Sequence, residues 1–197
     1  MLLSACASHQ TLAPYSADVV PALWSRHHQQ MLDLSHWQVK GKIGYKNTTE
    51  AGSAWVDWTQ QAQQFTLHLS GPFGAGSMQI MGDHGLLTLR QADGADISLN
   101  SAAAITSEQL LFDDLPFEEL SYWIRGIPSP NAEASQLSYN QQSLLTVLHQ
   151  SGWQLLFSKY RQTSAGTLPG KIIATQGKVR FKLIIKEHLF DNQMTSH

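Results

Sequence analysis

Residues 64–82 read QFTLHLSGPFGAGSMQIMG, and this stretch decides the fold class of the chain. Apolar and polar residues alternate over 65–70 and again over 77–80, a period of two that predicts two strands with one apolar face each. A proline and glycines on both sides of Phe73 favour a tight loop between the strands. The stretch is therefore predicted to form an antiparallel strand pair whose loop carries Phe73.

The sequence leaves two positions open for the Phe73 ring. Either the ring folds back onto the sheet, or it stays at the loop tip and enters something outside the protein. A phenylalanine left in water forgoes about 1.5–3 kcal/mol of burial free energy. An exposed ring would therefore favour an apolar partner outside the protein.

The same alternation recurs on both sides of this strand pair. It predicts strands over 37–45, 54–58, 86–90 and 95–99 and, after an interruption, over 136–139, 144–150, 153–160, 171–176 and 179–186. Together these segments make about eleven antiparallel strands. Helical spacing and capping residues predict about three helices, over 22–34, over 106–112, and from Pro116 to just before Gly126.

A mainly β fold with some helix follows from these elements. An antiparallel sheet of that size curls, and helices placed between its two halves cover its concave side. The space between sheet and helices is predicted to be lined by apolar residues of both, namely Val56, Trp58, Leu67, Leu69, Met78, Ile80 and Leu87 from strands, and Phe117, Leu120 and Ile124 from a helix. Periodicity leaves open whether this space is a cavity or a filled core, the more common arrangement.

Composition excludes several classes of protein. The 197 residues are 42% hydrophobic and carry a formal net charge of −2, without the excess of Lys and Arg typical of nucleic-acid-binding proteins. No apolar run approaches the roughly 20 residues that span a bilayer. Cys6 is the only cysteine, so a disulfide within the chain is impossible. Residues 1–21 are predicted as an N-terminal segment and tether, and residues 22–197 as a single domain.

The sequence contains no catalytic constellation, and it predicts no cofactor or metal site. The histidines lack metal-ligand spacing, and the glycines of 71–76 lack the Lys-Ser or Lys-Thr of a phosphate loop. We therefore expect no enzyme. Four basic residues lie near one another on the final strand, either as a solvated face or as a contact with anionic lipid or an acidic partner: Lys178, Arg180, Lys182 and Lys186.

Several short motifs, in their order along the chain, resemble the LolB family of outer-membrane lipoprotein receptors. They are LSAC at 3–6, which resembles a bacterial lipobox, WQVKG at 37–41, Trp58 in the second strand, GPFG at 71–74, and LSYWIRG at 120–126 followed by Pro128. The likeness covers nearly the whole chain. No single motif is very specific, whereas their order and spacing together are.

This resemblance implies a fold and a function. The fold is an incomplete antiparallel β-barrel capped by helices around a hydrophobic cavity. The function is to accept lipoproteins from the periplasmic carrier LolA and to insert them into the inner leaflet of the outer membrane. The implied partners are LolA, acylated lipoprotein cargo and outer-membrane phospholipid, and we expect a monomer.

The resemblance also assigns roles to two residues. Cys6 would be acylated and would anchor the protein to the outer membrane, facing the periplasm. In the family an apolar residue on the protruding loop, usually Leu, is needed for membrane insertion, and Phe73 occupies that position.

Two other classes of function stay open at this stage. A passive lipid-binding lipoprotein on the same scaffold would bind acyl chains without receiving cargo from a carrier. A structural lipoprotein with a filled core would bind no apolar probe.

Overall fold

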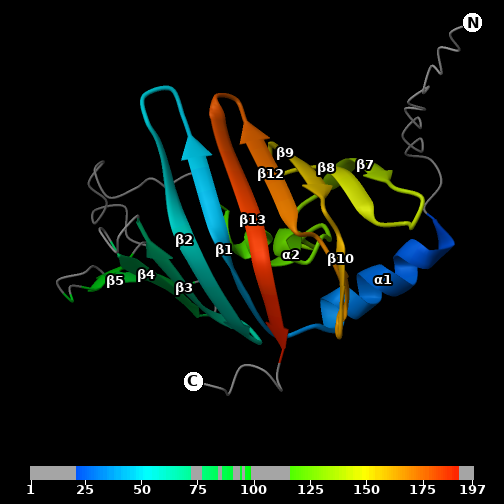
Figure 1. The fold of residues 1–197 in the computed structure, drawn as a ribbon, viewed down its shortest axis with the longest axis horizontal. Coiled ribbons are helices and arrows are strands. Elements are labelled where there is room, and N and C mark those ends of the chain that lie inside the picture. The colour runs from blue at the N-terminus through cyan, green and yellow to red at the C-terminus, as the bar shows by residue number, and fades with distance from the viewer. Residues whose placement is uncertain are drawn as a thin grey trace, which may run out of the picture.

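The computed structural model describes residues 21–71, 77–83, 86–90, 94, 96–98 and 116–190. One large curved sheet dominates this part of the chain, with a short helix behind it and a second helix to one side (Figure 1). The elements, in order, are α1 (Ala22–Asp33), β1 (His36–Lys46), β2 (Ala51–Gln61), β3 (Gln64–Ser70), β4 (Met78–Asp83), β5 (Leu86–Arg90), β6 (Asp96–Ser98), α2 (Phe117–Ile124), β7 (Ala134–Tyr139), β8 (Leu145–Gln150), β9 (Trp153–Ser158), β10 (Arg161–Thr163), β11 (Gly166–Leu168), β12 (Lys171–Gln176) and β13 (Val179–Phe190).

Eleven of these strands form a single antiparallel sheet. Their order is β6-β5-β4-β3-β2-β1-β13-β12-β9-β8-β7, so the first and last long strands of the chain are neighbours at its centre. The N-terminal meander from β1 to β6 forms one half, and the C-terminal strands form the other. Strands β6 and β7 end the sheet on opposite sides, which leaves it open. The predicted mainly β, incomplete antiparallel sheet is confirmed.

Two details differ from the sequence-based expectation. The short hairpin of β10 and β11 forms a separate two-stranded sheet that the sequence analysis missed, because three-residue strands are too short for alternation to be visible. The described residues contain two helices, α1 and α2, where about three were expected. The third predicted helix, over 106–112, lies outside the described residues.

A β-bulge in β13 controls which side chains face inward along the central strand pair. The register shifts between Lys40 and Gly41 of β1, where Lys186 of β13 has no partner. Before the bulge, Phe181 and Ile185 are buried, whereas after it the inward positions are those of His188 and Phe190, opposite buried Val39 and Trp37. The bulge thus moves the inward face from odd to even positions.

The inner face of the sheet and α2 together form the hydrophobic core. Strand β9 shows the pattern clearly, since Trp153, Leu155 and Phe157 are buried and the intervening residues are exposed. Helix α2 buries Trp123 and Ile124 against this face. We call this side of the sheet the inner face and the opposite side the outer face, which is the side toward the viewer in Figure 1.

Candidate functional site

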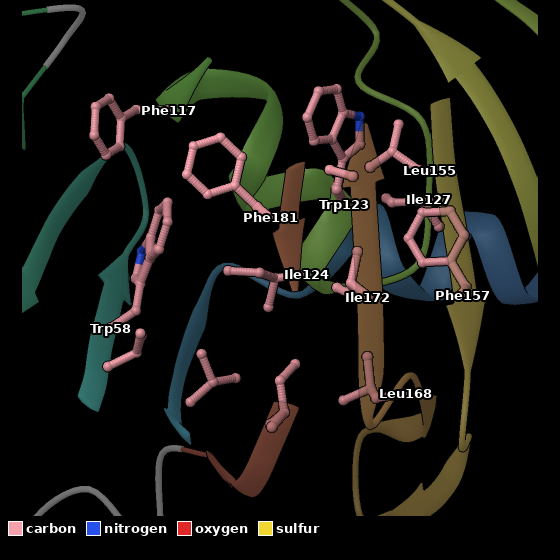
Figure 2. Packing of buried hydrophobic residues seen from close by; sticks show 14 of the residues in the cluster. Trp58, Phe117, Trp123, Ile124, Ile127, Leu155, Phe157, Leu168, Ile172 and Phe181 are labelled. Carbon is pink, nitrogen blue, oxygen red and sulfur yellow. The ribbon is translucent and has the colours of Figure 1, made fainter. Parts of the chain in front are cut away.

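An apolar gap lies between α2 and the inner face of the sheet. It has a volume of about 50 Å³ and is lined by residues from both halves of the sheet and from the helix: Ile43, Val56, Trp58, Leu67, Leu69, Leu120, Trp123, Ile124, Leu155, Ile172, Ala174, Phe181 and Leu183. Figure 2 shows Trp58, Phe181 and Ile172 of the sheet around the same space as Ile124 of the helix. The lining offers an adaptable hydrocarbon surface and no charged group.

Six of the ten residues predicted to line a cavity do line this gap. They are Val56, Trp58, Leu67, Leu69, Leu120 and Ile124. Leu87 and Phe117 instead line a larger neighbouring pocket. Ile80 is buried in the core, and Met78 packs against the core half-buried. Whether any of these residues contacts an acyl chain stays a prediction.

The other half of the lining comes mainly from the C-terminal strands and was not predicted from the sequence. Ile172 and Ala174 of β12 and Phe181 and Leu183 of β13 reach the gap because β13 pairs with β1 on one side and with β12 on the other. The apolar alternation of 179–186 was visible in the sequence. The pairing that places this strand beside β1 could not be read from the sequence.

A second pocket, which we call the mouth, opens next to the gap. It has a volume of about 550 Å³ and lies where the end of α1, the start of β1, the β2–β3 turn and α2 come together. Its lining mixes aromatic rings such as Trp37, Phe65 and Phe117 with polar side chains such as Gln60 and Ser121. A mixed lining of this kind suits a ligand with an apolar part and a polar part.

A row of aromatic rings joins the mouth to the gap. The ring centroids of Trp37 and Trp58 are 5.9 Å apart, those of Trp58 and Phe65 are 5.0 Å apart, and those of Phe65 and Phe117 are 6.2 Å apart. Trp58 lines the gap, whereas the other three line the mouth. Gly82 makes room for this row, because a Cβ there would overlap the Phe65 ring. The two spaces therefore share one continuous apolar wall.

Buried polar contacts fix the C-terminal end of α2. The Trp123 indole Nε1 donates to Gln150 Oε1 at 2.8 Å. The Gln150 side chain also accepts from the Ser129 backbone N–H at 2.9 Å and donates to the Ser129 and Ala132 carbonyl oxygens, each at 2.8 Å. Gln150 is only 2% exposed, and each of its hydrogen bonds is made in an environment where a lost partner is costly.

Arg125 links α2 to the end of α1. Its guanidinium donates to the carbonyl oxygens of Met31 and Leu34, and its Nε donates to the Ser121 carbonyl at 3.0 Å. The guanidinium carbon lies 4.7 Å from the centroid of the Tyr122 ring. Burial lowers the pKa of Arg125 to about 10, so the group stays charged at neutral pH. Carbonyls at a helix C-terminus carry partial negative charge and are suitable acceptors for this cation.

Three half-buried histidines have pKa values below the ordinary value. Burial lowers the pKa of His188 to about 4, and the nearby Arg161 cation acts in the same direction. Burial also lowers the pKa of His27 and His28 on α1. Within the described ranges, no three His, Cys, Asp or Glu side chains are grouped so as to hold a metal ion. In that same part of the chain, neither helix has the length and apolar character required to cross a membrane.

Two predicted functional residues, Phe73 and Cys6, lie outside the described residues. The four predicted basic residues lie on β13 and in the turn before it, and all are exposed: Lys178, Arg180, Lys182 and Lys186. The last three are on the outer face, away from the gap and the mouth.

Comparison with known proteins identifies the family. The family model described as outer membrane lipoprotein LolB matches residues 35–187, which is most of the chain. The chain belongs to the LolB family. Its relatives in this family include the outer-membrane lipoprotein LolB of Cellvibrio japonicus, 34% identical over 94% of this chain and 90% of the relative. The corresponding proteins of Ectopseudomonas mendocina and Pseudomonas aeruginosa are 33% and 31% identical, also over 94% of this chain and 90% of each relative.

Solved structures support the LolB-family fold at much lower sequence identity. A LolA superfamily protein from Nitrosomonas europaea aligns with a TM-score of 0.54 at 8% identity, over 88% of this chain and 97% of that protein. A DUF1329 family protein from Desulfovibrio piger aligns with a TM-score of 0.51 at 5% identity, over 85% and 93% of the two chains. The family model and the curated relatives confirm the resemblance stated from the motifs and the outer-membrane location. LolB proteins are a lipoprotein-localisation family.

Proposed function

We propose that this protein receives lipoproteins from the periplasmic carrier LolA and inserts them into the inner leaflet of the outer membrane. The proposal includes an acyl anchor on Cys6 that holds the protein at the membrane, facing the periplasm, and it treats the protein as a monomer. The observation that carries the proposal is the apolar gap joined to the mouth by a continuous aromatic wall. Membership of the LolB family supports the same role.

The cargo explains why a covered apolar space is needed. Each buried methylene of an acyl chain contributes about 0.8 kcal/mol, so several long chains cannot cross water unshielded. The gap of about 50 Å³ is much smaller than such a chain. The cargo must therefore separate α2 from the sheet as it enters, beginning from the larger mouth.

We infer from the contacts of α2 that its N-terminal end moves. Its C-terminal end is fixed by the Trp123–Gln150 hydrogen bond and by Arg125. Its N-terminal end begins after Pro116 without a side-chain cap and places Phe117 at the mouth. We infer that the acyl chain displaces Phe117 and Leu120 first, while Trp123 stays in place. Release is possible because the lining gives general apolar contact rather than a tight fit to one chain.

Phe73 has the role of bringing this space to the lipid. Phe73 follows the end of β3 by three positions in the sequence, and an apolar ring that enters the bilayer regains the burial free energy of about 1.5–3 kcal/mol that it forgoes in water. Transfer between carrier, protein and bilayer then proceeds down a gradient of binding free energy and requires no ATP.

The test is transfer of a radiolabelled lipoprotein from purified carrier to liposomes, with full-length protein carrying Cys6→Ala so that every variant is soluble. Phe73→Glu is expected to retain binding of an acylated peptide but to impair delivery to liposomes, and Phe73→Leu is expected to deliver normally. Equal loss of binding and delivery in Phe73→Glu would make Phe73 a structural residue. Saturable acyl binding without any transfer would favour the passive lipid-binding alternative.

A further inference from the structure

The outer face of the sheet carries a concentration of positive charge that the proposed transfer of acyl chains does not use. Strands β1 and β13 together contain six Lys and Arg residues and a single acidic residue, Glu187. The whole chain, in contrast, has 13 basic and 15 acidic residues. Five of these six basic residues are exposed. They lie beside Trp55 of β2 or further along β1 and β13 toward the same end of the sheet. We call them the basic face: Lys42, Lys46, Arg180, Lys182 and Lys186.

Trp55 differs from every other tryptophan of the protein. All six tryptophans lie in the described residues, and five of them are at most 5% exposed, whereas Trp55 is 46% exposed. It points outward because its neighbour Val56 points into the gap. An indole kept at the surface is typical of a site where one side of a residue meets an apolar phase and the other meets water.

Two cations of the basic face lie against the Trp55 indole. The Lys186 Nζ is 4.5 Å from the ring centroid and the Lys42 Nζ is 5.8 Å from it. In the described part of the chain, neither ammonium group forms an ion pair. Asp57, the carboxylate nearby on β2, is already held by the Gln38 amide at 2.6 Å and by Lys40 at 3.8 Å. The two lysines can therefore turn their charge to an external anion while their methylene chains stay on the ring.

The space beside Trp55 is a built depression rather than a flat surface. An open groove of about 370 Å³ runs over β13, β1, β2 and β3. Trp55, Lys40, Lys186, His68 and Ser70 are among its lining residues, together with two carboxylates, Asp57, which is held by Gln38 and Lys40, and Glu187. Lys186 reaches it because of the β-bulge, which leaves this residue without a partner on β1. The bulge thus gives the outer face a cation beside the exposed indole.

We propose that the basic face and Trp55 bind the anionic headgroups of a phospholipid bilayer. Lysine ammonium groups contact the phosphates, and the Trp55 indole lies at the boundary between headgroups and acyl chains. The inference rests on the proposed function insofar as that function places the protein at a membrane. It adds a second contact with the bilayer, separate from the Phe73 loop, and with it a defined orientation of the sheet.

The position of Trp55 in the sheet favours lipid over an acidic protein. Its cross-strand partner on β3 is Ser70, the last residue of that strand. The chain continues from Ser70 into the segment that contains Phe73. The sequence thus places the proposed insertion residue only three positions after Ser70, the residue that pairs with Trp55, which favours one bilayer as the partner of both.

Charge at this face should dominate the binding. Each basic residue near an anionic membrane contributes about a fivefold factor to the partition coefficient, and the effect is screened by salt over a distance of about 10 Å at 0.1 M. Replacing two lysines by neutral residues is expected to weaken binding about 25-fold at low salt. Vesicles of a neutral phospholipid should show no such dependence.

The experiment is vesicle co-sedimentation of the full chain carrying Cys6→Ala. The vesicles contain either phosphatidylcholine alone or phosphatidylcholine with about 30% of the anionic lipid phosphatidylglycerol. The test variant is Lys42→Gln with Lys186→Gln. The matched control changes two exposed basic residues away from the basic face, Arg26→Gln with Lys159→Gln. In parallel, phospholipid brominated in its acyl chains is used to quench tryptophan fluorescence, which should reach Trp55 and not the five buried tryptophans, as a Trp55→Phe variant can verify.

Salt-sensitive binding to anionic vesicles that is lost in the test variant, kept in the control and accompanied by Trp55 quenching would support the proposal. Unchanged binding in the test variant, or absence of Trp55 quenching, would overturn it. Loss of carrier binding with unchanged vesicle binding would also overturn it and assign the face to an acidic protein. If the protein binds vesicles through this face but transfers no lipoprotein, the lipid-binding role of the basic face is supported and the proposed function is contradicted.

Discussion

Filling the apolar gap is expected to raise the stability of the protein and to weaken its binding of acyl chains. Ala174 on β12 lines the gap, is 4% exposed, and pairs with Leu155 and Phe181, which line it too. Ala174→Val adds two methyl groups at this position without changing the strand, because valine favours β structure. The added carbons occupy space that an acyl chain would otherwise fill.

The expected magnitudes follow from the size of the gap. At about 24 cal/mol per Å³, eliminating a cavity of about 50 Å³ is worth roughly 1 kcal/mol of folding stability. Two methyl groups that displace two methylenes of cargo remove about 1.6 kcal/mol of binding, which is a factor of roughly 15 in Kd. The two effects have opposite sign, which a purely structural core would not produce.

The assays are urea unfolding, followed by tryptophan fluorescence, and titration with a fluorescent long-chain fatty acid. Ala134→Val on β7 is the matched control, since Ala134 packs half-buried against the core away from the gap. This control is expected to leave probe binding unchanged. A stability gain in Ala174→Val with undiminished probe binding would refute the assignment of the gap as the acyl site. A loss of stability would show that the gap cannot accept the two added methyl groups.

Two other predictions concern the groups that hold the helices. Arg125→Met is expected to lower the free energy of unfolding by about 1–3 kcal/mol, because the carbonyl oxygens of Met31 and Leu34 lose their donor. The urea midpoint measures this loss. An unchanged midpoint would show that Arg125 does not stabilise the contact between α1 and α2. His188 has a pKa of about 4 when folded, below the ordinary 6.5, so its contribution to stability is complete above about pH 6.5 and is lost as the pH falls toward 4. His188→Phe should therefore flatten the decline in stability between pH 6.5 and 4, as thermal melts at a series of pH values will show, and an equally steep decline in the variant would contradict this.

Much of the fold could be predicted from local periodicity. The alternation over 64–82 predicted β3 and β4 correctly, and the two-sided pattern of 179–186 predicted most of β13. The C-terminal extension of β13 to Phe190 was missed, because the bulge at Lys186 changes the face and so breaks the period of two. The β10–β11 hairpin was missed because its strands are only three residues long.

The candidate site was predicted only in part, for a reason of topology. Val56, Trp58, Leu67 and Leu69 were found because they alternate within adjacent strands of one meander. Ile172 and Phe181 were missed, although each lies in a strand that was predicted, because nothing local states that β13 pairs with β1. The motif at 120–126 includes Arg125, but its role was not predicted, since its acceptors at the end of α1 are about ninety residues earlier in the chain.

The path of the cargo can be tested directly by locating the acyl chain of a bound lipoprotein. A lipoprotein whose acyl chain carries a photoactivatable diazirine is loaded onto purified carrier, passed to the full chain with Cys6→Ala, irradiated and mapped by mass spectrometry. If cargo passes between α2 and the sheet, labels are expected on inner-face residues of β2, β3, β12 and β13 and on the N-terminal part of α2 around Leu120. Labels confined to the outer face, or none on this protein while transfer to vesicles proceeds, would contradict the claim that cargo passes between α2 and the sheet.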